Sequence, residues 1–522
     1  MSHSEAARSV GPALTLENMA LLSRYSRRHA GGQPDKAALV FRQHRWTYAQ
    51  FDRAIDGAVT LLRQEGLQPG DRVAYFGRNS DLFFIVLMAI ARAGLVLVPI
   101  NWRNTAAETA YVLDDSGARL ILADGEFAPL VAEACGGATP SILTDDLRTR
   151  IAAAPPSPQA ANDPDAPFLQ LYTSGTTGKP KGVLTSERAM SIQRRMERVS
   201  GHFDDWGDDE VVLSPLPSFH VGGMSWVCMG FERGVTVVVT TDATPGGILD
   251  LCLEHGITRT FIVPTLVRAL IGEMDARAVR VPSLRGIHYG AASMDGALLE
   301  RSVDRLGCRF LQYYGMTEIT GTMTILGPAD HDTARPHLLR SVGRPLPGNS
   351  IEIRDPQGCL LSSGEPGEIW VAGPTLMIEY WNRPEATAEV LVDGWYRTGD
   401  GGRLDAQGYL YLTDRIKDMI VSGGENVYPA EVEAVLRDHP AIADCAVFGL
   451  PDAKWGEGVT AALELKNGHA VDQTEVIAFT RKSLAAYKIP RRVEVVDALP
   501  RTAAGKIQRG AVRAAFLEDG SP

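Results

Sequence analysis

The feature that most constrains the fold is a repeated alternation of short apolar runs with helix-length amphipathic segments. Apolar positions recur at helical spacing after Thr47, a suitable N-cap, until Gly66. Strand-like runs at 72–76 and 95–99 then flank an apolar helix expected over 80–93. Further strand-like runs occur at 119–123, 235–240, 259–263, 285–289 and 309–314. This rhythm predicts an α/β protein with largely parallel sheets wrapped by helices.

The pattern changes twice toward the C-terminus. Residues 342–412 alternate in short runs divided by glycine and proline, which predicts a β-rich subdomain. After residue 414 the pattern is mixed α+β. We therefore expect a large N-terminal domain of stacked α/β subdomains plus the β-rich subdomain over 1–413, a hinge at 414–418 and a small mobile α+β domain over 419–522.

Composition excludes several classes of function. The formal charge of −11 and the lack of a Lys/Arg-rich tract disfavour a nucleic-acid partner. The longest apolar run, 83–91, is shorter than the ~20 residues that cross a bilayer. Neither a CxxC nor an HExxH pattern occurs, so no zinc site is expected. Without a targeting signal at either end, the expected location is cytoplasmic.

One loop carries a strong chemical signal. Residues 171–182, LYTSGTTGKPKG, follow a strand-like run and combine glycines, hydroxyl side chains and lysines. Backbone N–H groups, hydroxyls and an ammonium group can surround phosphate oxygens. The loop is not a Walker motif, because its glycines are too close together and Pro180 stands where Ser or Thr is required. It indicates a phosphate site; a flexible surface turn is the alternative.

Further motifs follow this loop, in the order YGMTE at 314–318, GEI at 367–369, YRTGD at 396–400, DRIKD at 414–418, SGGEN at 422–426 and PRTAAGK at 500–506. Together with the loop they resemble the motifs of the adenylate-forming superfamily of acyl-CoA synthetases, nonribosomal peptide synthetase adenylation domains and firefly luciferase. The resemblance spans nearly the whole chain. It implies that ATP and an acid form an acyl-adenylate and pyrophosphate, and that coenzyme A then takes the acyl group and releases AMP.

The resemblance also implies roles for individual residues around ATP. The residues implied to hold the β- and γ-phosphates are Thr173, Ser174, Gly175, Thr176, Thr177, Gly178 and Lys181. Thr317 would contact the α-phosphate, and Glu318 would hold Mg²⁺, for which a carboxylate is a suitable hard ligand. The implied adenosine contacts are Tyr314 stacked on adenine, the backbone of Gly290, Ala291 and Ala292 at its edge, and Asp400 and Arg415 on the ribose.

Further residues are implied to serve catalysis and the thiol step. Lys506 would bridge the acyl oxygen and the phosphate, where two anions meet during attack. Lys417 aligns with the hinge, and Gly423 and Gly424 would line the pantetheine tunnel. His220 aligns with an aromatic gate between the acyl pocket and that tunnel.

The acyl pocket is predicted from the same resemblance. Its expected residues are His220, Val221, Met224, Val263, His288, Gly290, Gly315, Met323 and Ile325. Their apolar or small character predicts an acid with an apolar body, and a medium- or long-chain fatty acid is favoured over an aryl or hydroxycinnamic acid. His288 could bond a ring hydroxyl or pack in the core. No aspartate occurs at 218–220, which disfavours an amino acid.

Two other functions are compatible with some of these motifs. A luciferase-like oxygenase would use the same adenylation residues, and oxygen-dependent light or decarboxylation would reveal it. A non-catalytic nucleotide-binding scaffold would not need Glu318, Lys417 and Lys506 together. The sequence leaves the oligomeric state open, with a homodimer as one option.

Overall fold

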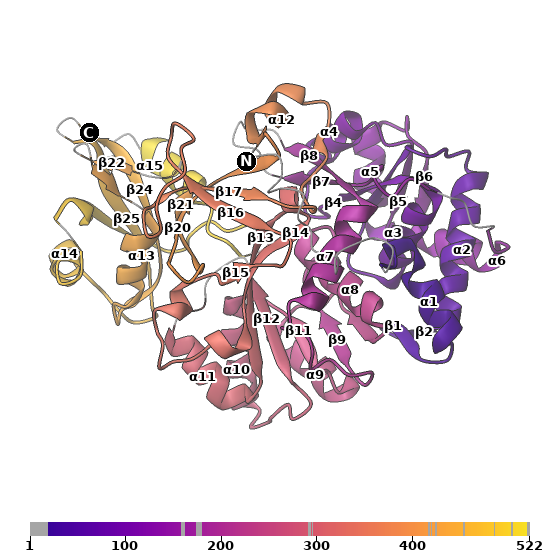
Figure 1. The fold of residues 1–522 in the computed structure, drawn as a ribbon, viewed down its shortest axis with the longest axis horizontal. Coiled ribbons are helices and arrows are strands. Elements are labelled where there is room, and N and C mark those ends of the chain that lie inside the picture. Colours follow the sequence, from indigo (N-terminus) through magenta and orange to yellow (C-terminus); the bar gives the residue numbers. More distant parts are fainter. Residues whose placement is uncertain are drawn as a thin grey trace. The chain divides into compact units, whose positions relative to one another are not determined.

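A computed structural model describes residues 19–157, 162–173, 180–290, 294, 296–415, 418, 420–422, 425–427, 429–452, 455–484, 486–502 and 505–518 (Figure 1). The chain forms two compact units. The first comprises Met1–Ser350 and Ala372–Tyr396, and the second comprises Ile351–Val371 and Arg397–Pro522. The predicted hinge at 414–418 stays a prediction.

The first unit contains a nine-stranded sheet. Its order is β15-β14-β13-β12-β11-β9-β10-β1-β2. The strands are β1 (Ala37–Phe41), β2 (His44–Thr47), β9 (Val211–Ser214), β10 (Thr236–Val239), β11 (Arg259–Phe261), β12 (Gly286–Gly290), β13 (Arg309–Met316), β14 (Gly321–Leu326) and β15 (Arg344–Pro345). From β1 to β13 neighbouring strands are parallel, whereas β2, β14 and β15 are antiparallel additions at the edges.

A seven-stranded sheet in the same unit has the order β18-β8-β7-β4-β3-β5-β6. The strands are β3 (Arg72–Phe76), β4 (Val96–Ile100), β5 (Leu120–Ala123), β6 (Ser141–Leu143), β7 (Pro167–Thr173), β8 (Lys181–Ser186) and β18 (Glu379–Tyr380). The pairs from β7 through β6 are parallel, and β8 pairs antiparallel with both β7 and β18. The α/β class with parallel sheets is therefore confirmed.

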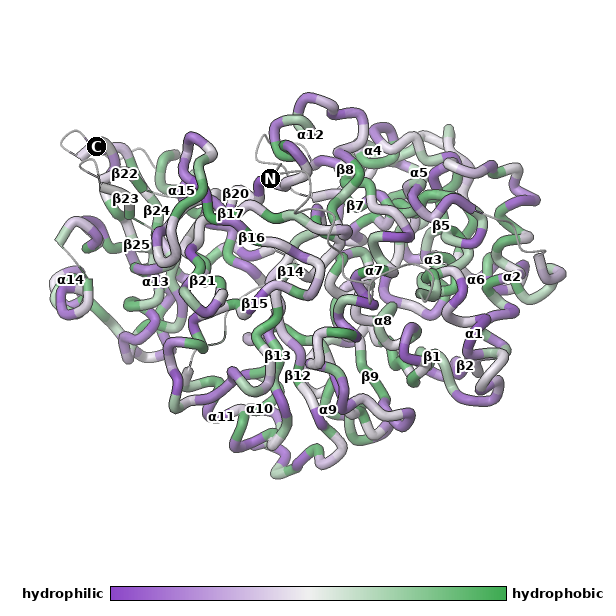
Figure 2. Tube along the Cα trace, viewed as in Figure 1, coloured by the Kyte–Doolittle hydropathy of each residue, from purple (hydrophilic) through white to green (hydrophobic). Residues whose placement is uncertain are grey.

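Helices cover these sheets. They are α1 (Tyr25–Gly32), α2 (Tyr48–Gln64), α3 (Asp81–Ala93), α4 (Ala106–Ser116), α5 (Ala128–Cys135), α6 (Thr144–Ala153), α7 (Glu187–Val199), α8 (Val221–Arg233), α9 (Pro245–His255), α10 (Pro264–Ala276), α11 (Gly296–Leu306) and α12 (Pro384–Val390). One core joins α2, α3 and α8 to both sheets, and a second packs α9, α10 and α11 on the nine-stranded sheet. Surface helices such as α11 alternate hydrophobic with hydrophilic residues, whereas β9 is hydrophobic (Figure 2).

Local signals account for the helix boundaries. Thr47 accepts a hydrogen bond from the Gln50 N–H group in a capping box at the start of α2, as its sequence predicts. The Ser80 hydroxyl caps α3 by accepting a hydrogen bond from the Phe83 N–H group. Gly94 ends α3 in the left-handed conformation, with φ of 69°, which glycine adopts without a Cβ clash.

The second unit holds two further sheets. The first consists mainly of β16 (Ser350–Arg354), β17 (Gly367–Ala372), β20 (Trp395–Leu404) and β21 (Leu410–Arg415), and β19 (Leu391–Val392) pairs with the start of β20. The second consists of β22 (Ile420–Ser422), β23 (Glu425–Val427), β24 (Ile442–Asp452), β25 (Gly456–Leu465) and β26 (Arg492–Val496). Its helices are α13 (Pro429–Arg437), α14 (Gln473–Thr480) and α15 (Arg509–Glu518).

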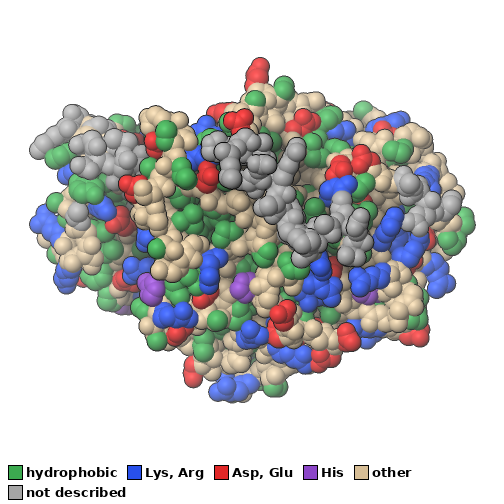
Figure 3. Space-filling view, in the orientation of Figure 1, with side chains coloured by type: hydrophobic (Ala, Val, Ile, Leu, Met, Phe, Trp, Pro, Cys, Tyr) green, Lys and Arg blue, Asp and Glu red, His purple; other side chains and the backbone are tan. Residues whose placement is uncertain are grey.

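Two surface properties complete the description. No described helix combines the length and apolar character that a membrane crossing requires. On the face in Figure 3, lysine and arginine side chains are interspersed with aspartate and glutamate.

Candidate functional site

The predicted phosphate loop closes an antiparallel hairpin. Thr173 ends β7 and lies directly opposite Lys181, the first residue of β8. The loop positions Ser174, Gly175, Thr176, Thr177 and Gly178 lie outside the described residues. The hairpin therefore fixes both ends of the loop, and Lys181 stands at its exit.

Tyr380 joins Lys181 to Glu318. The phenol of Tyr380 donates a 3.0 Å hydrogen bond to Glu318 Oε1, and the Lys181 ammonium lies 4.9 Å from the centre of the Tyr380 ring. A second phenol, that of Tyr396, lies 3.4 Å from the Tyr380 oxygen. Tyr380 and Tyr396 are buried, whereas Lys181 and Glu318 are only half-buried. A cation and a carboxylate from distant segments thus meet on one buried tyrosine, which we call the Tyr380 cluster.

Backbone hydrogen bonds from residues 377–381 hold this cluster together. The N–H group of Met377 donates to the Glu318 carbonyl at 2.7 Å. The Trp381 N–H group donates to the Gly182 carbonyl, also at 2.7 Å, and β18 pairs with β8 through Tyr380 and Val183. The same short segment therefore bonds to the turn that carries Glu318 and to the strand that carries Lys181.

Close strand contact explains one glycine of the YGMTE motif. The pairing of β13 with β14 shifts register between Tyr314 and Gly315. A Cβ at Gly315 would lie 1.6 Å from the Gly321 carbonyl oxygen, so only glycine fits there. Thr317 and Glu318 follow in a short 3₁₀ turn, and both are half-buried. Pairing continues past the register shift to Met316, so Thr317 and Glu318 directly follow the end of β13.

Other predicted nucleotide contacts are placed individually. Tyr314 is largely buried in β13. Gly290 ends β12, and a Cβ added there would lie 3.0 Å from the Tyr313 carbonyl oxygen. Ala291 and Ala292 lie outside the described residues. Their adenine-binding role stays a prediction.

The second unit carries the other nucleotide and thiol residues. Asp400 in β20 lies directly opposite Arg415 in β21, so antiparallel pairing brings the two predicted ribose contacts into register. Lys506 is exposed. Lys417, Gly423 and Gly424 lie outside the described residues, and their roles stay predictions.

The loop that carries His220 is fixed by Asn79, which the sequence analysis did not single out. The buried Asn79 amide donates to the carbonyls of Leu216 at 2.9 Å and Thr240 at 3.0 Å and accepts from the Ser218 N–H group at 2.7 Å. His220 then precedes α8 as its N-terminal flanking residue. An asparagine without a recognisable motif gave no signal, because its partners lie more than 130 residues away.

His220 is neutral at physiological pH. Its side chain is accessible, yet crowding by protein atoms and the positive charge of Arg103 lower its pKa to about 4. The ring lies against Phe219, with centroids 4.4 Å apart. This uncharged ring stands at the start of α8, and its role as a gate stays a prediction.

The predicted acyl-pocket residues divide into two groups. Val221, Val263 and Gly315 are at least partly accessible, together with the neighbouring Phe261 and Tyr313. Four predicted residues are buried in the core, namely Met224, His288, Met323 and Ile325. Their contact with a substrate stays a prediction.

Aromatic rings dominate the inner part of this region. A Cβ added at Gly222 of α8 or at Gly290 of β12 would lie 3.4 Å from the Phe261 ring. The Phe261 ring centroid lies 5.5 Å from that of Tyr313 and 6.1 Å from that of Trp226. Two glycines thus lie close to an aromatic ring, with two further rings near it.

His288 belongs to this aromatic group. Its Nδ1 lies 2.6 Å from the Tyr313 hydroxyl, and its ring centroid lies 4.6 Å from that of Trp226. Burial and the nearby charges of Arg259 and Arg309 lower its pKa well below the usual value, so the ring is neutral. The ring is buried in the core, and its Nε2 has no hydrogen-bond partner among the described residues, so a hydrogen bond to a substrate hydroxyl stays a prediction.

Comparisons with known proteins fit this arrangement. Residues 26–381 match the AMP-binding enzyme family, and residues 431–506 match the AMP-binding enzyme C-terminal domain. The chain belongs to the AMP-binding enzyme family. Members of this family activate acids at the expense of ATP, and the chain is an AMP-forming ligase. The resemblance seen in the motifs is therefore confirmed, and the non-catalytic scaffold is excluded.

Individual AMP-binding enzymes are similar over nearly the whole chain. The fatty acid–[acyl-carrier-protein] ligase ScoC of Streptomyces coeruleorubidus is 39% identical, with 94% of this chain and 95% of that protein covered. The feruloyl-CoA synthase of an Amycolatopsis species is 38% identical, with 90% and 94% covered. The o-succinylbenzoate CoA synthetase of Bacillus subtilis, solved with its acyl-adenylate, is 32% identical, with a TM-score of 0.84 and 94% and 98% covered.

Proposed function

We propose that this AMP-binding enzyme is a carboxylic acid–CoA ligase, in which an acid attacks ATP to give acyl-AMP and pyrophosphate, and coenzyme A then attacks acyl-AMP to give acyl-CoA and AMP. The observation that carries this proposal is the Tyr380 cluster. It brings Lys181, at the exit of the phosphate loop, to the carboxylate of Glu318 through one phenol. A cation can bind phosphate oxygens and a carboxylate can bind Mg²⁺, so the pair suits a nucleotide–metal site.

The donor set suits a nucleotide-bound Mg²⁺. Glu318 offers one half-buried carboxylate, held by Tyr380, and Mg²⁺ that travels with ATP commonly takes one or two protein carboxylates and completes its shell with phosphates and water. When bound, the ion would neutralise phosphate charge. Thr317, beside Glu318, would donate a hydrogen bond from its hydroxyl to a phosphate oxygen.

The remaining steps belong to residues of the chain itself. Lys506 would donate hydrogen bonds to the acyl oxygen and the α-phosphate as two anions approach, and its charge would favour the crowded transition state. Asp400 and Arg415 would bind the ribose, and Tyr314 the adenine. In the second half-reaction the C–O bond of the mixed anhydride breaks, AMP leaves and the thiol loses its proton as the C–S bond forms.

We propose an acid with an aromatic body as the substrate. The half-buried ring of Phe261 lies close to Gly222 and Gly290, and aromatic rings pair favourably with other rings. The rings of Trp226 and Tyr313 lie near it and that of His288 lies against Trp226, so these surroundings are aromatic rather than aliphatic. The likeness to feruloyl-CoA synthase supports this choice.

A medium- or long-chain fatty acid is the second candidate. The sequence favoured it, and the likeness to ScoC, whose name specifies a fatty acid and an acyl-carrier protein, supports it. Free coenzyme A is the proposed thiol because the feruloyl and o-succinylbenzoate relatives are named for it.

An AMP-release assay tests these proposals together. The purified enzyme, with Mg²⁺ and ATP, is offered two sets of acids. The first holds hydroxycinnamic, benzoic and arylacetic acids, and the second holds saturated acids of about 4 to about 16 carbons, chain lengths on the order of those that apolar pockets accept. Coenzyme A and a phosphopantetheinylated carrier protein serve as alternative thiols. Aromatic acids should give the highest kcat/KM with coenzyme A. Fatty acids as better substrates would reverse the preference, and oxygen-dependent light or decarboxylation would indicate an oxygenase.

A further inference from the structure

Lys506 lies on a small hairpin whose backbone is defined by its own hydrogen bonds. Arg501 and Ile507 form an antiparallel bridge across it. The Thr502 N–H group donates to the Lys506 carbonyl at 2.7 Å, and the Lys506 N–H group donates to the Thr502 hydroxyl at 3.2 Å. The direction of the Lys506 side chain therefore depends on how the described residues 500–502 and 505–508, here called the lysine hairpin, are attached to the rest of the unit.

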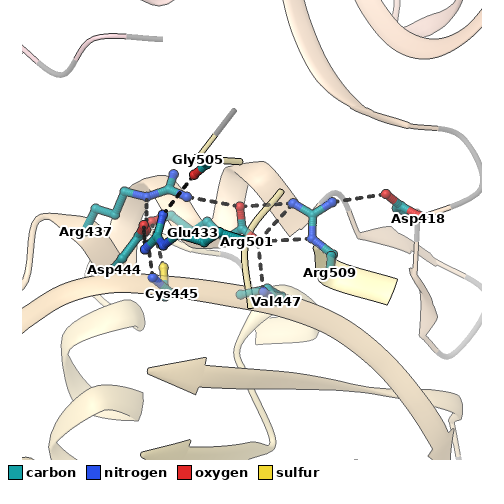
Figure 4. A network of polar contacts seen from close by, with 9 residues as sticks. All are labelled: Asp418, Glu433, Arg437, Asp444, Cys445, Val447, Arg501, Gly505 and Arg509. Carbon is teal, nitrogen blue, oxygen red and sulfur yellow. Dashed lines mark hydrogen bonds and ion pairs between the residues drawn. The ribbon is translucent and has the colours of Figure 1, made fainter. Parts of the chain in front are cut away.

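Two carboxylates attach the lysine hairpin at its two ends (Figure 4). At the first end, Arg501 Nη2 lies 2.8 Å from Asp444 Oδ2 at the start of β24. At the other end, Arg509 follows the hairpin and begins α15, and its Nε and Nη2 donate to Oε1 and Oε2 of Glu433 at 3.2 and 3.0 Å. The forked contact fixes the guanidinium in orientation as well as in position.

Glu433 is the centre of this arrangement. Its side chain on α13 is 5% exposed, and it also accepts the Val447 N–H group at 2.8 Å. Arg437 bridges the two carboxylates, with Nη2 3.3 Å from Glu433 Oε2 and Nε 3.1 Å from Asp444 Oδ1. Helix α13, strand β24 and both ends of the lysine hairpin are thus joined through charged groups, of which Glu433 is buried whereas Arg437 and Arg501 are exposed.

Arg509 makes one more contact, toward the predicted hinge. Its Nη1 lies 3.3 Å from Asp418 Oδ2, and Asp418 is the last residue of the DRIKD motif (Figure 4). One guanidinium therefore binds the end of the hinge segment on one side and Glu433 on the other.

We propose that Glu433 and Arg509 are positioning residues for the adenylation half-reaction, holding the lysine hairpin to α13 and to the end of the hinge so that Lys506 and the hinge move as one rigid body. The proposal rests on the proposed function, because it takes Lys506 as the residue that acts on the acid and the α-phosphate. A displacement of about 1 Å of a charge-stabilising group costs on the order of 100-fold in rate.

The rest of α15 is attached independently of Arg509. Val512 and Phe516 pack against Ala446 and Phe448, and Arg513 donates to the Gly449 carbonyl at 2.7 Å. Loss of the Arg509 contacts should therefore leave α15 docked while the lysine hairpin shifts.

The test compares Arg509→Gln with Arg513→Gln, a matched change one turn further along the same helix. Acid-dependent pyrophosphate exchange measures adenylation, and thioester formation from supplied acyl-adenylate measures the second half-reaction. Arg509→Gln should lower exchange by about 10- to 100-fold and the thiol step by less than about threefold. Arg513→Gln should leave both within about threefold, and Arg509→Lys, which keeps the charge but not the fork, should recover part of the exchange.

A double variant decides whether Arg509 acts through Lys506. If it does, Lys506→Ala with Arg509→Gln should exchange no more slowly than Lys506→Ala alone, because the residue being positioned is already gone. The proposal would be overturned if the losses of the two single variants multiply in the double variant. It would also be overturned if Arg509→Gln slows both half-reactions equally. Wild-type enzyme without acid-dependent exchange would remove the proposed function as well, whereas normal wild-type exchange with Arg509→Gln equal to Arg513→Gln would remove this inference alone.

Discussion

The Tyr380 cluster and the lysine hairpin hold charged side chains in place by different kinds of contact. Each is proposed to hold a charged side chain that acts on the nucleotide. In the Tyr380 cluster, Glu318 and Lys181 are placed by strand pairing, backbone hydrogen bonds and a neutral phenol. In the lysine hairpin, Lys506 is placed by arginine–carboxylate pairs on either side of a short turn.

The difference teaches how rigidity is distributed in this chain. Sheet hydrogen bonds are numerous and cooperative, so a residue at the end of a paired strand moves only with its sheet. A hairpin of about nine residues cannot bury enough apolar surface to hold itself and depends on contacts with its neighbours. We therefore expect the Tyr380 cluster to tolerate single polar changes better than the lysine hairpin does.

The largest effect is expected at the tip of the lysine hairpin. Lys506→Ala should lower acid-dependent pyrophosphate exchange by about 1,000-fold, because a preorganised charge at the transition state is lost. Thioester formation from supplied acyl-adenylate should remain largely intact. Normal exchange in this variant would show that the hairpin does not carry the catalytic cation.

The next effect concerns the predicted hinge at 414–418. Lys417→Pro fixes φ at a position predicted to change it between half-reactions. The thiol step should slow by on the order of 100-fold and adenylation by much less. Single-turnover measurements of each half-reaction would show this, and equal slowing of both would argue against a hinge there.

A smaller effect is expected in the Tyr380 cluster. Tyr380→Phe removes the hydrogen bond to Glu318, and a hydrogen bond to a charged group contributes about 1.5 kcal/mol, or roughly tenfold in rate. Exchange should fall by about that factor, with a raised Mg²⁺ requirement. Tyr411→Phe, which removes a comparable phenol bond to Asp405, is the control. A loss larger than that of Arg509→Gln would reverse the expected order of tolerance.

The smallest effect is expected when the pH is lowered, and it concerns the contribution of Asp444 to the free energy of unfolding. Burial acts to raise the pKa of Asp444, but the hydrogen bond from Arg501 and the charge of Arg437 bring that pKa below its usual value. A depressed folded-state pKa contributes stability above the unfolded value of about 3.9, and this stability is lost as pH falls through the folded value. Urea unfolding of wild type should therefore weaken more steeply below about pH 4 than that of Asp444→Asn. Parallel curves would show that Asp444 does not stabilise the attachment of the hairpin.

The sequence by itself determined the local structure and the chemical inventory. Caps such as Thr47 and Ser80 act on N–H groups three residues away, and apolar periodicity is set within a single element, so both can be predicted without the fold. The motifs predicted Glu318, Lys181 and Lys506 as site residues, because each of these residues lies within one continuous motif of recognisable residue types and spacing.

Only the tertiary structure decided which residues hold that chemistry in place. Tyr380 reaches Glu318 because β18 pairs with β8, a strand almost 200 positions earlier, and Arg509 reaches Glu433 across 76 positions. Neither pair has a spacing that periodicity could reveal, since the contact exists only after distant segments have packed. A hydrogen bond depends on where two atoms finally lie, whereas a helix or a strand depends mainly on its own neighbours.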